Sequence, residues 1–512
     1  MSTREAEAFA GRRLVVGIPG READDETVAF LRAIGAGGVI LYERNIESVA
    51  QTTRLIAALR AALDRPLLVT IDHEGGLIVR FKRGVTLFPG NSALGAAASP
   101  VDAEAVGHVM GEELRAIGFD VNLAPVLDVL TPAYSPGITI RSFGDDPARV
   151  GELGEAMIRG MQAAGLAACA KHLPGKGAAT VDAHFDLPVI ELARPAAAEH
   201  LGPFRRAAKA RVACMMTSHV IVPAWERDET VPATFSRTIA TELARADLHH
   251  DGVLITDDLE MGAVMTAGRG LGVPVEQAAV RAVEAGHDLL LVCHRRARIQ
   301  AAHRTLAEAY DAGRFDAAFV AASDARIKAL HRRCGEKARP RATDSRGARL
   351  LQALLAQRAL EVRRGGHALL PLPPGRHVAV VYPLLEGIEG TLVEDEVVDM
   401  GRLIAAYFEP SEIAATLLPY RLDGGPDEVR ELFQAAKGFE AIVLVCFHAM
   451  AYAHERELLR AFEEFEDRLA VVFTRNPLDA ELLERSPTVL ITHGFRTFQI
   501  GAAIEALCGR LG

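Results

Sequence analysis

The sequence lacks the features that would place the protein on nucleic acid or in a membrane. Its 512 residues contain 57 Lys and Arg against 67 Asp and Glu, a formal net charge of −10, so there is no basic excess to bind a phosphate backbone. A short basic cluster, RRCGEKARPR at 332–341, is interpreted as a solvated linker. No apolar stretch reaches the length of a membrane span, and the opening MSTREAEAFAGRR has no signal-peptide core. We therefore expect no nucleic-acid partner, no membrane partner and a cytoplasmic location.

Disulfide and metal motifs are missing as well. None of the six cysteines forms a C-x-x-C pair, and four of them lie in or next to apolar strand-like runs. This is typical of small buried side chains in a reducing compartment. The first predicted strand ends in VGIPGRE, without the H-x-H of many metal-dependent barrel hydrolases, and no H-E-x-x-H occurs. We predict no metal and no cofactor, although His172, Asp182 and His184 could in principle ligate zinc.

Eight short aliphatic or β-branched runs alternate with helical patterns along the first 300 or so residues. They are RLVVGI (13–18), GGVILY (37–42), PLLVTI (66–71), FDVNLA (119–124), GLAACA (165–170), VACMMT (212–217), GVLIT (252–256) and HDLLLV (287–292). Continuous apolar strands separated by helices indicate a parallel sheet covered on both faces. Eight such units predict a (β/α)8 TIM-like barrel, with a doubly wound open sheet as the less favoured alternative.

The composition changes after residue 334. EKARPRATDSRGA is rich in charge and turn formers, which is typical of a linker. Beyond it, further apolar runs alternate with helical segments: HVAVVY (377–382), EAIVLVCF (440–447), LAVVFT (469–474) and TVLITH (488–493). The predicted organisation is α/β throughout, with a barrel at 1–335, a linker at 336–347 and a smaller α/β (αβα) sandwich at 348–512.

Polar and charged residues gather where the predicted barrel strands finish. The strand ends read IDHEGG, LAPVLD, AKHLPGKG, MTSHV and ITDDLEM. Because barrels of this type have their sites at the carboxyl ends of the strands, we expect one site to which at least five strands contribute residues. Of Asp257 and Asp258, one is expected to cap the following helix while the other is available as a nucleophile or general base. Asp72 and Asp128 present the same alternatives.

The segment KHLPGKGAATVDAHFDLP, at 171–188, is the most crowded of these strand ends. In its D-x-H, Asp182 can bond one imidazole nitrogen of His184 while the other nitrogen faces a substrate, an arrangement suited to proton transfer near neutral pH. A lone D-x-H is more often a polar loop satisfied by water. The adjacent pair Lys171-His172 at the strand end favours a functional site.

Several of these stretches resemble the family 3 glycoside hydrolases, in particular their β-N-acetylhexosaminidase branch. They span nearly the whole predicted barrel in the family's order: IDHEGGLIVRF (71–81), GFDVNLAPVLDV (118–129), ITIRSFGDDP (138–147), AKHLPGKGAATVDAHFDLP (170–188), MMTSHVIVPAWE (215–226), PATFSRTI (232–239) and VLITDDLEMGAV (253–264). The K-H-x-P-G-x-G…D-x-H stretch is the most specific and separates this branch from the β-glucosidases. The sequence differs from the usual family pattern at His73, Leu77, Lys176 and Ala183.

The resemblance implies a retaining exo-β-N-acetylglucosaminidase that acts through a glycosyl-enzyme intermediate. Asp257 matches the family's nucleophile, and His184, oriented by Asp182, matches its acid/base dyad. Five residues match positions that bind the hydroxyls of the terminal sugar: Asp72, Arg80, Arg141, Lys171 and His172. The implied partner is a small carbohydrate substrate, either a GlcNAc-terminated oligosaccharide or a muropeptide-like wall fragment.

Three alternatives stay open. A phosphorylase would use the same residues with phosphate as acceptor, because a histidine does not repel phosphate as a carboxylate would. A β-glucosidase would leave the D-x-H dyad unexplained, and a sugar-binding protein on an inactive barrel would leave a complete set of reacting groups unused. The sequence does not predict the aglycone or the oligomeric state.

Overall fold

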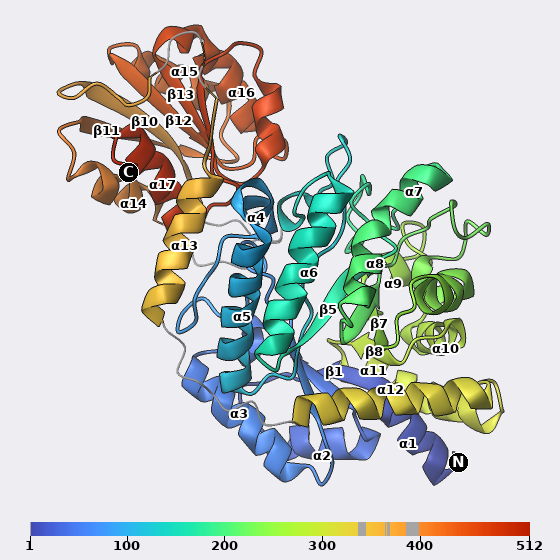
Figure 1. Ribbon diagram of the computed structural model, residues 1–512. Coiled ribbons are helices and arrows are strands. Elements are labelled where there is room, and N and C mark those ends of the chain that lie inside the picture. Colours follow the sequence, from blue (N-terminus) through green and yellow to red (C-terminus); the bar gives the residue numbers. More distant parts are fainter. Residues whose placement is uncertain (1, 336–344, 364, 366–368, 386–398, 512) are drawn as a thin grey trace. The chain divides into compact units, whose positions relative to one another are not determined.

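The computed structural model describes residues 2–335, 345–363, 365, 369–385 and 399–511. The chain folds into two compact units (Figure 1). Unit 1 comprises Met1–Glu74, Ile78–Thr86 and Ser99–Ala348, and unit 2 comprises Gly75–Leu77, Leu87–Ala98 and Arg349–Gly512. The expected linker at 336–347 falls mostly outside the described residues, which resume with helix α13 (Ser345–Ala359).

Unit 1 contains a closed barrel of eight parallel strands. They are β1 (Leu14–Gly17), β2 (Gly38–Leu41), β3 (Leu68–Ile71), β4 (Val121–Asn122), β5 (Ala167–Leu173), β6 (Cys214–Thr217), β7 (Val253–Asp258) and β8 (Leu289–Val292). The strands pair in sequence order, and β1 pairs with β8 to close the barrel. The predicted (β/α)8 fold is confirmed. β5 and β7 continue beyond their predicted runs, so Lys171, His172 and Asp257 are strand residues rather than loop residues.

Alternate strand residues fill the barrel interior, as the twofold period of a strand requires. The interior cluster includes Cys169, Met216 and Ile255, all at most 2% exposed. Helices surround the strands (Figure 1): α1 (Arg4–Arg13), α2 (Asp25–Ile34), α3 (Val49–Ala62), α5 (Pro100–Ile117), α6 (Pro147–Ala163), α7 (Arg194–His200), α8 (Gly202–Lys209), the π-helix η4 (Thr238–Asp247), α9 (Gly262–Met265), α10 (Val275–Ala285) and α11 (Arg296–Asp311).

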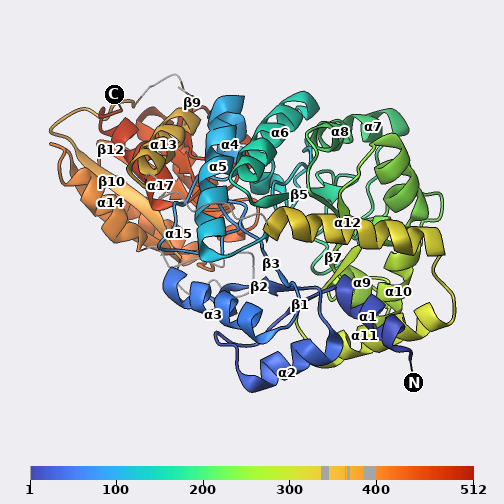
Figure 2. The ribbon, with the colours of Figure 1, turned by 60° about the horizontal axis from the view of Figure 1, so that its bottom comes forward.

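Helix α12 (Ala317–Gly335) lies across one end of the barrel instead of along its side (Figure 2). Its buried residues Ile327, Leu330 and Cys334 join the same apolar cluster as the barrel interior. The cluster includes first or second residues of the strands, such as Val15 of β1 and Val253 of β7. α12 therefore closes the amino-terminal end of the barrel and leaves the carboxyl ends of the strands for the loops that follow them.

Unit 2 is built on a six-stranded sheet in the order β11-β10-β12-β13-β14-β9. Its strands are β9 (Glu361–Arg363), β10 (His377–Leu384), β11 (Ala414–Arg421), β12 (Ala441–Cys446), β13 (Leu469–Phe473) and β14 (Thr488–Ile491). All neighbours are parallel except β9, which pairs antiparallel with β14. The predicted second α/β domain is confirmed as a mixed sheet. The sequence did not indicate β9, which is short and polar, or β11, an edge strand that contains Pro419.

Two short segments from the first hundred residues belong to unit 2. One carries Gly76, whose carbonyl oxygen accepts hydrogen bonds from Arg496 Nε and Nη2 at 3.0 and 2.6 Å. The other carries α4 (Asn91–Ala97), in which Ser92 Oγ lies 2.9 Å from His493 Nδ1. Gly76 has φ +56, and a Cβ there would lie 2.4 Å from Gly90 Cα, so the position requires glycine. The glycine pair after β3 thus marks where the chain leaves the barrel unit.

Further helices complete unit 2: α13, α14 (Met400–Phe408), α15 (Pro426–Ala436), α16 (Ala453–Phe462) and α17 (Thr497–Leu507). Among the residues that the structure describes, no helix combines the length and apolar character needed to span a membrane.

Candidate active site

Glu74, just beyond β3, lies between two cations. Arg141 donates to it twice, from Nε to Oε2 at 2.9 Å and from Nη2 to Oε1 at 2.7 Å. Lys171 Nζ, from β5, lies 2.7 Å from Glu74 Oε1 and 2.8 Å from Asp72 Oδ1. Burial would raise the pKa of Glu74, but the neighbouring Arg141 and Lys171 outweigh it and bring that pKa to about 2. Glu74 is therefore an ionised counterion that fixes a guanidinium and an ammonium at the end of the barrel strands.

Asp72 extends this network toward Arg80. Its carboxylate directly follows β3, accepts from Lys171 through Oδ1, and places Oδ2 3.8 Å from Arg80 Nη2. The Arg80 side chain is 8% exposed and that of Asp72 is 18% exposed, so both are largely withdrawn from solvent. Four of the five residues expected to bind sugar, Asp72, Arg80, Arg141 and Lys171, thus belong to one network of ion pairs centred on Glu74 and Asp72.

His172, the fifth, is held by Asp128. Asp128 Oδ2 lies 2.7 Å from His172 Nδ1, while Oδ1 accepts from the backbone N–H groups of His172 and Lys176 at 3.3 and 2.8 Å. Burial, assisted by nearby cations of which Lys176 is the strongest, holds the pKa of His172 well below its usual value. The imidazole is therefore neutral, and when Nδ1–H donates to Asp128, Nε2 is left as an acceptor. Asp128 serves as the partner of a histidine, which resolves the alternatives that its strand-end position left open.

Asp257, near the end of β7, lies beside Lys176. The Lys176 Nζ–Asp257 Oδ2 distance is 3.8 Å, and their side chains are 6% and 16% exposed. Burial would raise the pKa of Asp257, but Lys176 and, to a smaller extent, His219 and His184 lower it below its usual value. Lys176 is close enough to keep Asp257 ionised, but at 3.8 Å it does not form a tight ion pair with the carboxylate.

Asp258 has the structural role of the two adjacent aspartates. Its Oδ1 accepts from the Glu260 backbone N–H at 3.1 Å, and its Oδ2 lies 3.0 Å from His294 Nε2. The Asp258 backbone N–H donates to Asp257 Oδ1 at 2.9 Å. Asp258 therefore shapes the turn after β7 and orients its neighbour, which leaves Asp257 available for chemistry.

Asp182 and His184 form the expected dyad on the loop after β5. His184 Nδ1 lies 2.6 Å from Asp182 Oδ1, and the His184 backbone N–H donates to the same oxygen at 3.0 Å. Burial would raise the pKa of Asp182, but the hydrogen bond from His184 outweighs it, so that pKa is about 2. The His184 side chain is 47% exposed, in contrast to 11% for Asp182. The carboxylate is fixed inside while the imidazole is presented to solvent.

The dyad loop is attached to the segment that follows Asp257. The backbone N–H groups of Gly262 and Ala263 donate to the carbonyl oxygens of His184 and Ala183 at 3.2 and 3.1 Å. A Cβ on Gly262 would lie 2.4 Å from the His184 oxygen, so this close approach requires glycine. These hydrogen bonds therefore fix the loop that carries His184 to the segment that follows Asp257.

Sequence reasoning did not identify Glu74 or Lys176 as site residues. Glu74 stands in the IDHEGG strand end, but its role depends on contacts with residues 67 and 97 positions away, Arg141 and Lys171. Lys176 stood out only as a departure from the family pattern, and the structure places it beside Asp257. Within the described part of the chain, no group of three or more His, Cys, Asp or Glu side chains could hold a metal ion; His172 is bonded to Asp128 and His184 to Asp182 instead.

The chain is similar to proteins of one known family. The model of the glycosyl hydrolase family 3 N-terminal domain matches residues 12–330. The beta-hexosaminidase of Alkalilimnicola ehrlichii is 38% identical over 300 residues, which are 57% of this chain and 84% of that protein. The beta-hexosaminidase of Thiobacillus denitrificans is 38% identical over 289 residues, 55% of this chain and 78% of that protein.

One of the solved structures that resemble the chain covers both units. It is a glycoside hydrolase family 3 beta-N-acetylglucosaminidase from Paenibacillus sp. str. FPU-7, with a TM-score of 0.90 and 31% identity. The likeness covers 100% of this chain and 98% of that one.

Proposed function

The chain belongs to glycosyl hydrolase family 3, and from that membership we propose that it is a retaining exo-β-N-acetylglucosaminidase that removes terminal GlcNAc from oligosaccharides or wall-derived fragments. The proteins that it resembles, two beta-hexosaminidases and a beta-N-acetylglucosaminidase, support this substrate class. The observation that carries the proposal is that a buried, ionised Asp257 and an Asp182–His184 dyad occur together, with the dyad loop hydrogen-bonded to the segment that follows Asp257.

In the first step, the Asp257 carboxylate attacks the anomeric carbon of the terminal sugar. The bond from that carbon to the leaving oxygen breaks, and the leaving oxygen takes a proton from His184 Nε2. Asp182, ionised and bonded to Nδ1, stabilises the imidazolium that must exist before this transfer. Lys176 favours the ionised nucleophile before attack. The product is a glycosyl ester on Asp257.

In the second step, neutral His184 takes a proton from water at Nε2, and the water oxygen attacks the anomeric carbon. The ester bond to Asp257 breaks, which restores the carboxylate and releases the sugar with its original anomeric configuration. Both steps use the same imidazole in its two protonation states, so an exposed histidine with a fixed carboxylate partner suits the reaction.

The network around Glu74 would bind the sugar that reacts. We assign hydroxyl recognition to Asp72, Arg80, Arg141, Lys171 and His172. Glu74 and Asp128 act as positioning residues: Glu74 pairs with Arg141 and Lys171, and Asp128 lies within hydrogen-bond distance of His172 Nδ1. Side chains fixed by ion pairs before the substrate arrives lose little conformational entropy on binding, and this favours precise placement of the anomeric carbon over Asp257.

A panel of aryl β-glycosides tests the proposal. We expect turnover of the N-acetylglucosaminide, with little turnover of the glucoside. A reversed preference would indicate a β-glucosidase, and no turnover of any member would indicate a sugar-binding protein on an inactive barrel.

The acid role of His184 is tested by changing the leaving group. His184→Ala should slow aryl glycosides with poor leaving groups far more than activated ones, since only the former need a proton. Asp186→Ala, on the same loop, serves as the matched control and should change neither. Equal slowing of both substrates by His184→Ala would remove this residue from the acid role.

One observation favours phosphorolysis at the same site as a second candidate function. Lys176 Nζ lies 3.8 Å from Asp257 Oδ2, so an anionic acceptor that approaches the anomeric carbon would meet a cation there. A cation favours an anionic acceptor. If phosphate competes with water, added phosphate will yield the sugar 1-phosphate, and Lys176→Met will reduce the phosphate-dependent product more than hydrolysis. Hydrolysis unaffected by phosphate, with no sugar phosphate formed, would exclude this function.

A further inference from the structure

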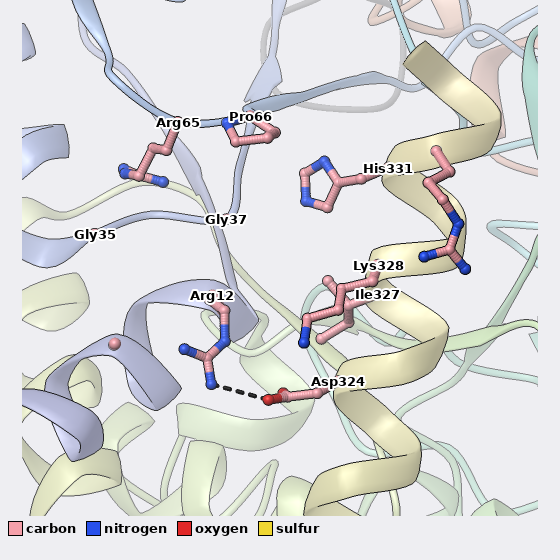
Figure 3. A pocket seen from close by; sticks show the side chains of 11 residues that line it. Arg12, Gly35, Gly37, Arg65, Pro66, Asp324, Ile327, Lys328 and His331 are labelled. Carbon is pink, nitrogen blue, oxygen red and sulfur yellow. Dashed lines mark hydrogen bonds and ion pairs between the residues drawn. The ribbon is translucent and has the colours of Figure 1, made fainter. Parts of the chain in front are cut away.

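Two cavities flank α12 at the amino-terminal end of the barrel, away from the proposed site. One, of about 520 Å³, is shown in Figure 3, where Lys328 and His331 point from α12 toward Arg12 and Arg65. Its two facing arginines are already engaged: Arg12 pairs with Asp324, and Arg65 donates to the carbonyl oxygens of Ala36 and Leu31. Lys328, His331 and Arg332 also line it, but the surface that it exposes is almost wholly apolar, so nothing selects a particular occupant.

The second cavity, of about 540 Å³, differs in polarity, because it exposes polar and apolar surface in similar amounts. We call it the basic cavity. Arg211 and His249 line it from the turns before β6 and β7, and Arg326 and Arg333 line it from α12. Among the described residues of its lining, Asp251 is the one acid. A local excess of arginine stands out in a chain with a formal net charge of −10.

Two of these residues occupy backbone positions that favour glycine. In the described barrel, six turns from a helix into the next strand contain a residue at positive φ. Four of them use glycine: Gly35, Gly118, Gly165 and Gly286. The other two use Arg211, with φ 52°, and His249, with φ 54°. A side chain disfavours this left-handed conformation. Both exceptions line the same cavity, so the strain coincides with the placement of basic groups there.

The surrounding structure holds these turns rigid. Gln162 of α6 donates to the Arg211 carbonyl oxygen at 3.3 Å and accepts from the Ala213 N–H at 2.9 Å. Arg245 Nη1 donates to the carbonyl oxygens of His250 and Gly252 at 2.7 and 2.6 Å. Such bracing fixes the positions from which Arg211 and His249 project.

The arginines of the basic cavity keep unused donors. Arg326 is fixed by Asp288, with Nε and Nη2 donating to it at 2.8–3.1 Å, which leaves Nη1. In the described structure, the guanidinium groups of Arg211 and Arg333 make no hydrogen bond or ion pair. Three guanidinium groups around one cavity, two of them unpaired, match the charge of an anion with several acceptor oxygens.

We propose that the basic cavity binds a small polyanion, a molecule with two or more phosphate or carboxylate groups, through Arg211, Arg326 and Arg333. The volume lies within the range of small-molecule sites, roughly 300–1,000 Å³. The planar guanidinium fork of arginine suits bidentate recognition of such groups. The site is independent of the proposed hydrolytic activity, because it lies at the opposite ends of the strands.

Calorimetric titration of the full chain with pyrophosphate and, separately, with citrate tests this proposal. We expect one binding event per chain with at least one of the two, weakening as salt is added. Binding of pyrophosphate alone identifies a phosphate site, and binding of citrate alone identifies a carboxylate site. No binding of either probe overturns the proposal.

Arg211→Gly gives the sharpest variant. Glycine suits φ 52°, so the melting temperature without ligand should stay the same or rise, while affinity for the probe should fall at least tenfold. Arg333→Ala should weaken binding similarly. Lys328→Ala, on the same helix but facing the other cavity, is the matched control and should bind as the unaltered chain does. Equal losses in all three variants would indicate unspecific charge attraction and overturn the assignment.

Discussion

In the barrel, Glu74 lies between Arg141 and Lys171 and its pKa is about 2; in unit 2, Glu455 lies among neutral donors and its pKa is about 7. Both carboxyl groups are buried, and burial raises the pKa of each. Glu455 accepts from the Tyr420 hydroxyl at 2.5 Å and from the backbone N–H groups of Phe447 and His448 at 2.7 Å. Cations reverse the effect of burial, whereas neutral donors do not.

A second pair repeats this difference. Asp479 of unit 2 accepts from the Ala449 and Met450 N–H groups at 2.7 and 3.0 Å, and burial raises its pKa to about 6. Asp182 of the barrel is also drawn inside, yet its pKa is about 2 because His184 donates to it. Glu74 and Asp182 are thus arranged to stay charged, while Glu455 and Asp479 hold the loop after β12 in place.

The largest expected effect is on kcat, when one carboxylate of the proposed site and one of unit 2 are each replaced by an amide. Asp257→Asn should lower kcat about 10⁴-fold or more, because the amide cannot form the glycosyl ester. Asp479→Asn should leave kcat per folded molecule unchanged, because its partners are the Asn476 side chain and backbone groups of a loop in unit 2. Steady-state kinetics on an aryl N-acetylglucosaminide, with circular dichroism to verify folding, measures both. Comparable losses would mean that the carboxylates of the two units do not differ in function.

The next effect concerns stability. Glu74→Gln removes a charge between two buried cations and should destabilise unit 1 by roughly 3–5 kcal/mol, the usual result of breaking a buried ion pair from one side. Glu455→Gln removes no charge partner and should destabilise unit 2 by only about 1 kcal/mol. Calorimetric unfolding of each variant provides the comparison. A larger loss for Glu455→Gln would contradict the assignment of neutral donors in unit 2.

The two units should also respond to pH in opposite directions. The folded-state pKa of Glu455 is raised from 4.5 to about 7, and that of Asp479 from 3.8 to about 6. Their stabilising contribution is therefore complete below the unfolded values and is lost as pH rises to 6–7, on the order of 3 kcal/mol for Glu455. Glu74 and Asp182 are lowered to about 2, so their contribution is present above about pH 4.5 and lost as pH falls toward 2.

Scanning calorimetry between pH 3 and pH 8 tests this prediction. The unit 2 transition should move to lower temperature as pH rises, and the barrel transition should move to lower temperature as pH falls. If the double variant Glu455→Gln, Asp479→Asn loses the fall in the unit 2 transition temperature with rising pH, that fall is due to these two groups. Parallel shifts of both transitions would contradict the comparison.

Asp128 sharpens the comparison from within the barrel, and its expected effect is the smallest. Burial raises its pKa even though the nearby cations Lys176 and Arg141 act in the opposite direction. Asp128→Asn should lower kcat/KM about tenfold by disturbing the orientation of His172. Deoxy substrate analogues distinguish a positioning role from a general loss of structure. In the variant, removing the hydroxyl that His172 contacts should reduce kcat/KM by a smaller factor than in the unaltered chain, whereas the factors for the other hydroxyls should not change. Unchanged factors throughout would leave Asp128 with a folding role alone.

The barrel and much of the site were predictable because topology converts strand ends into neighbours. Once ITDDLEM and KHLPGKG were recognised as ends of parallel strands, Asp257 and Lys171 had to lie on one face. The adjacent aspartates alone left the choice between Asp257 and Asp258 open; the family resemblance assigned the nucleophile to Asp257, and the structure adds the contacts of Asp258 with the Glu260 backbone and His294. The counterion role of Glu74 and the inclusion of 75–77 and 87–98 in unit 2 arise from contacts across long sequence separations, for which local patterns carry no signal.

The contact of Gly262 with the His184 carbonyl has a consequence for stereochemical fidelity. Retention requires the attacking oxygen and the proton donor to keep their separation on opposite faces of the sugar throughout two steps. Backbone hydrogen bonds join the loop of the proposed donor, His184, to the segment that directly follows β7, the strand of Asp257. We therefore expect the proposed donor and nucleophile to move together, so that the gap between them varies less than the rest of the rim.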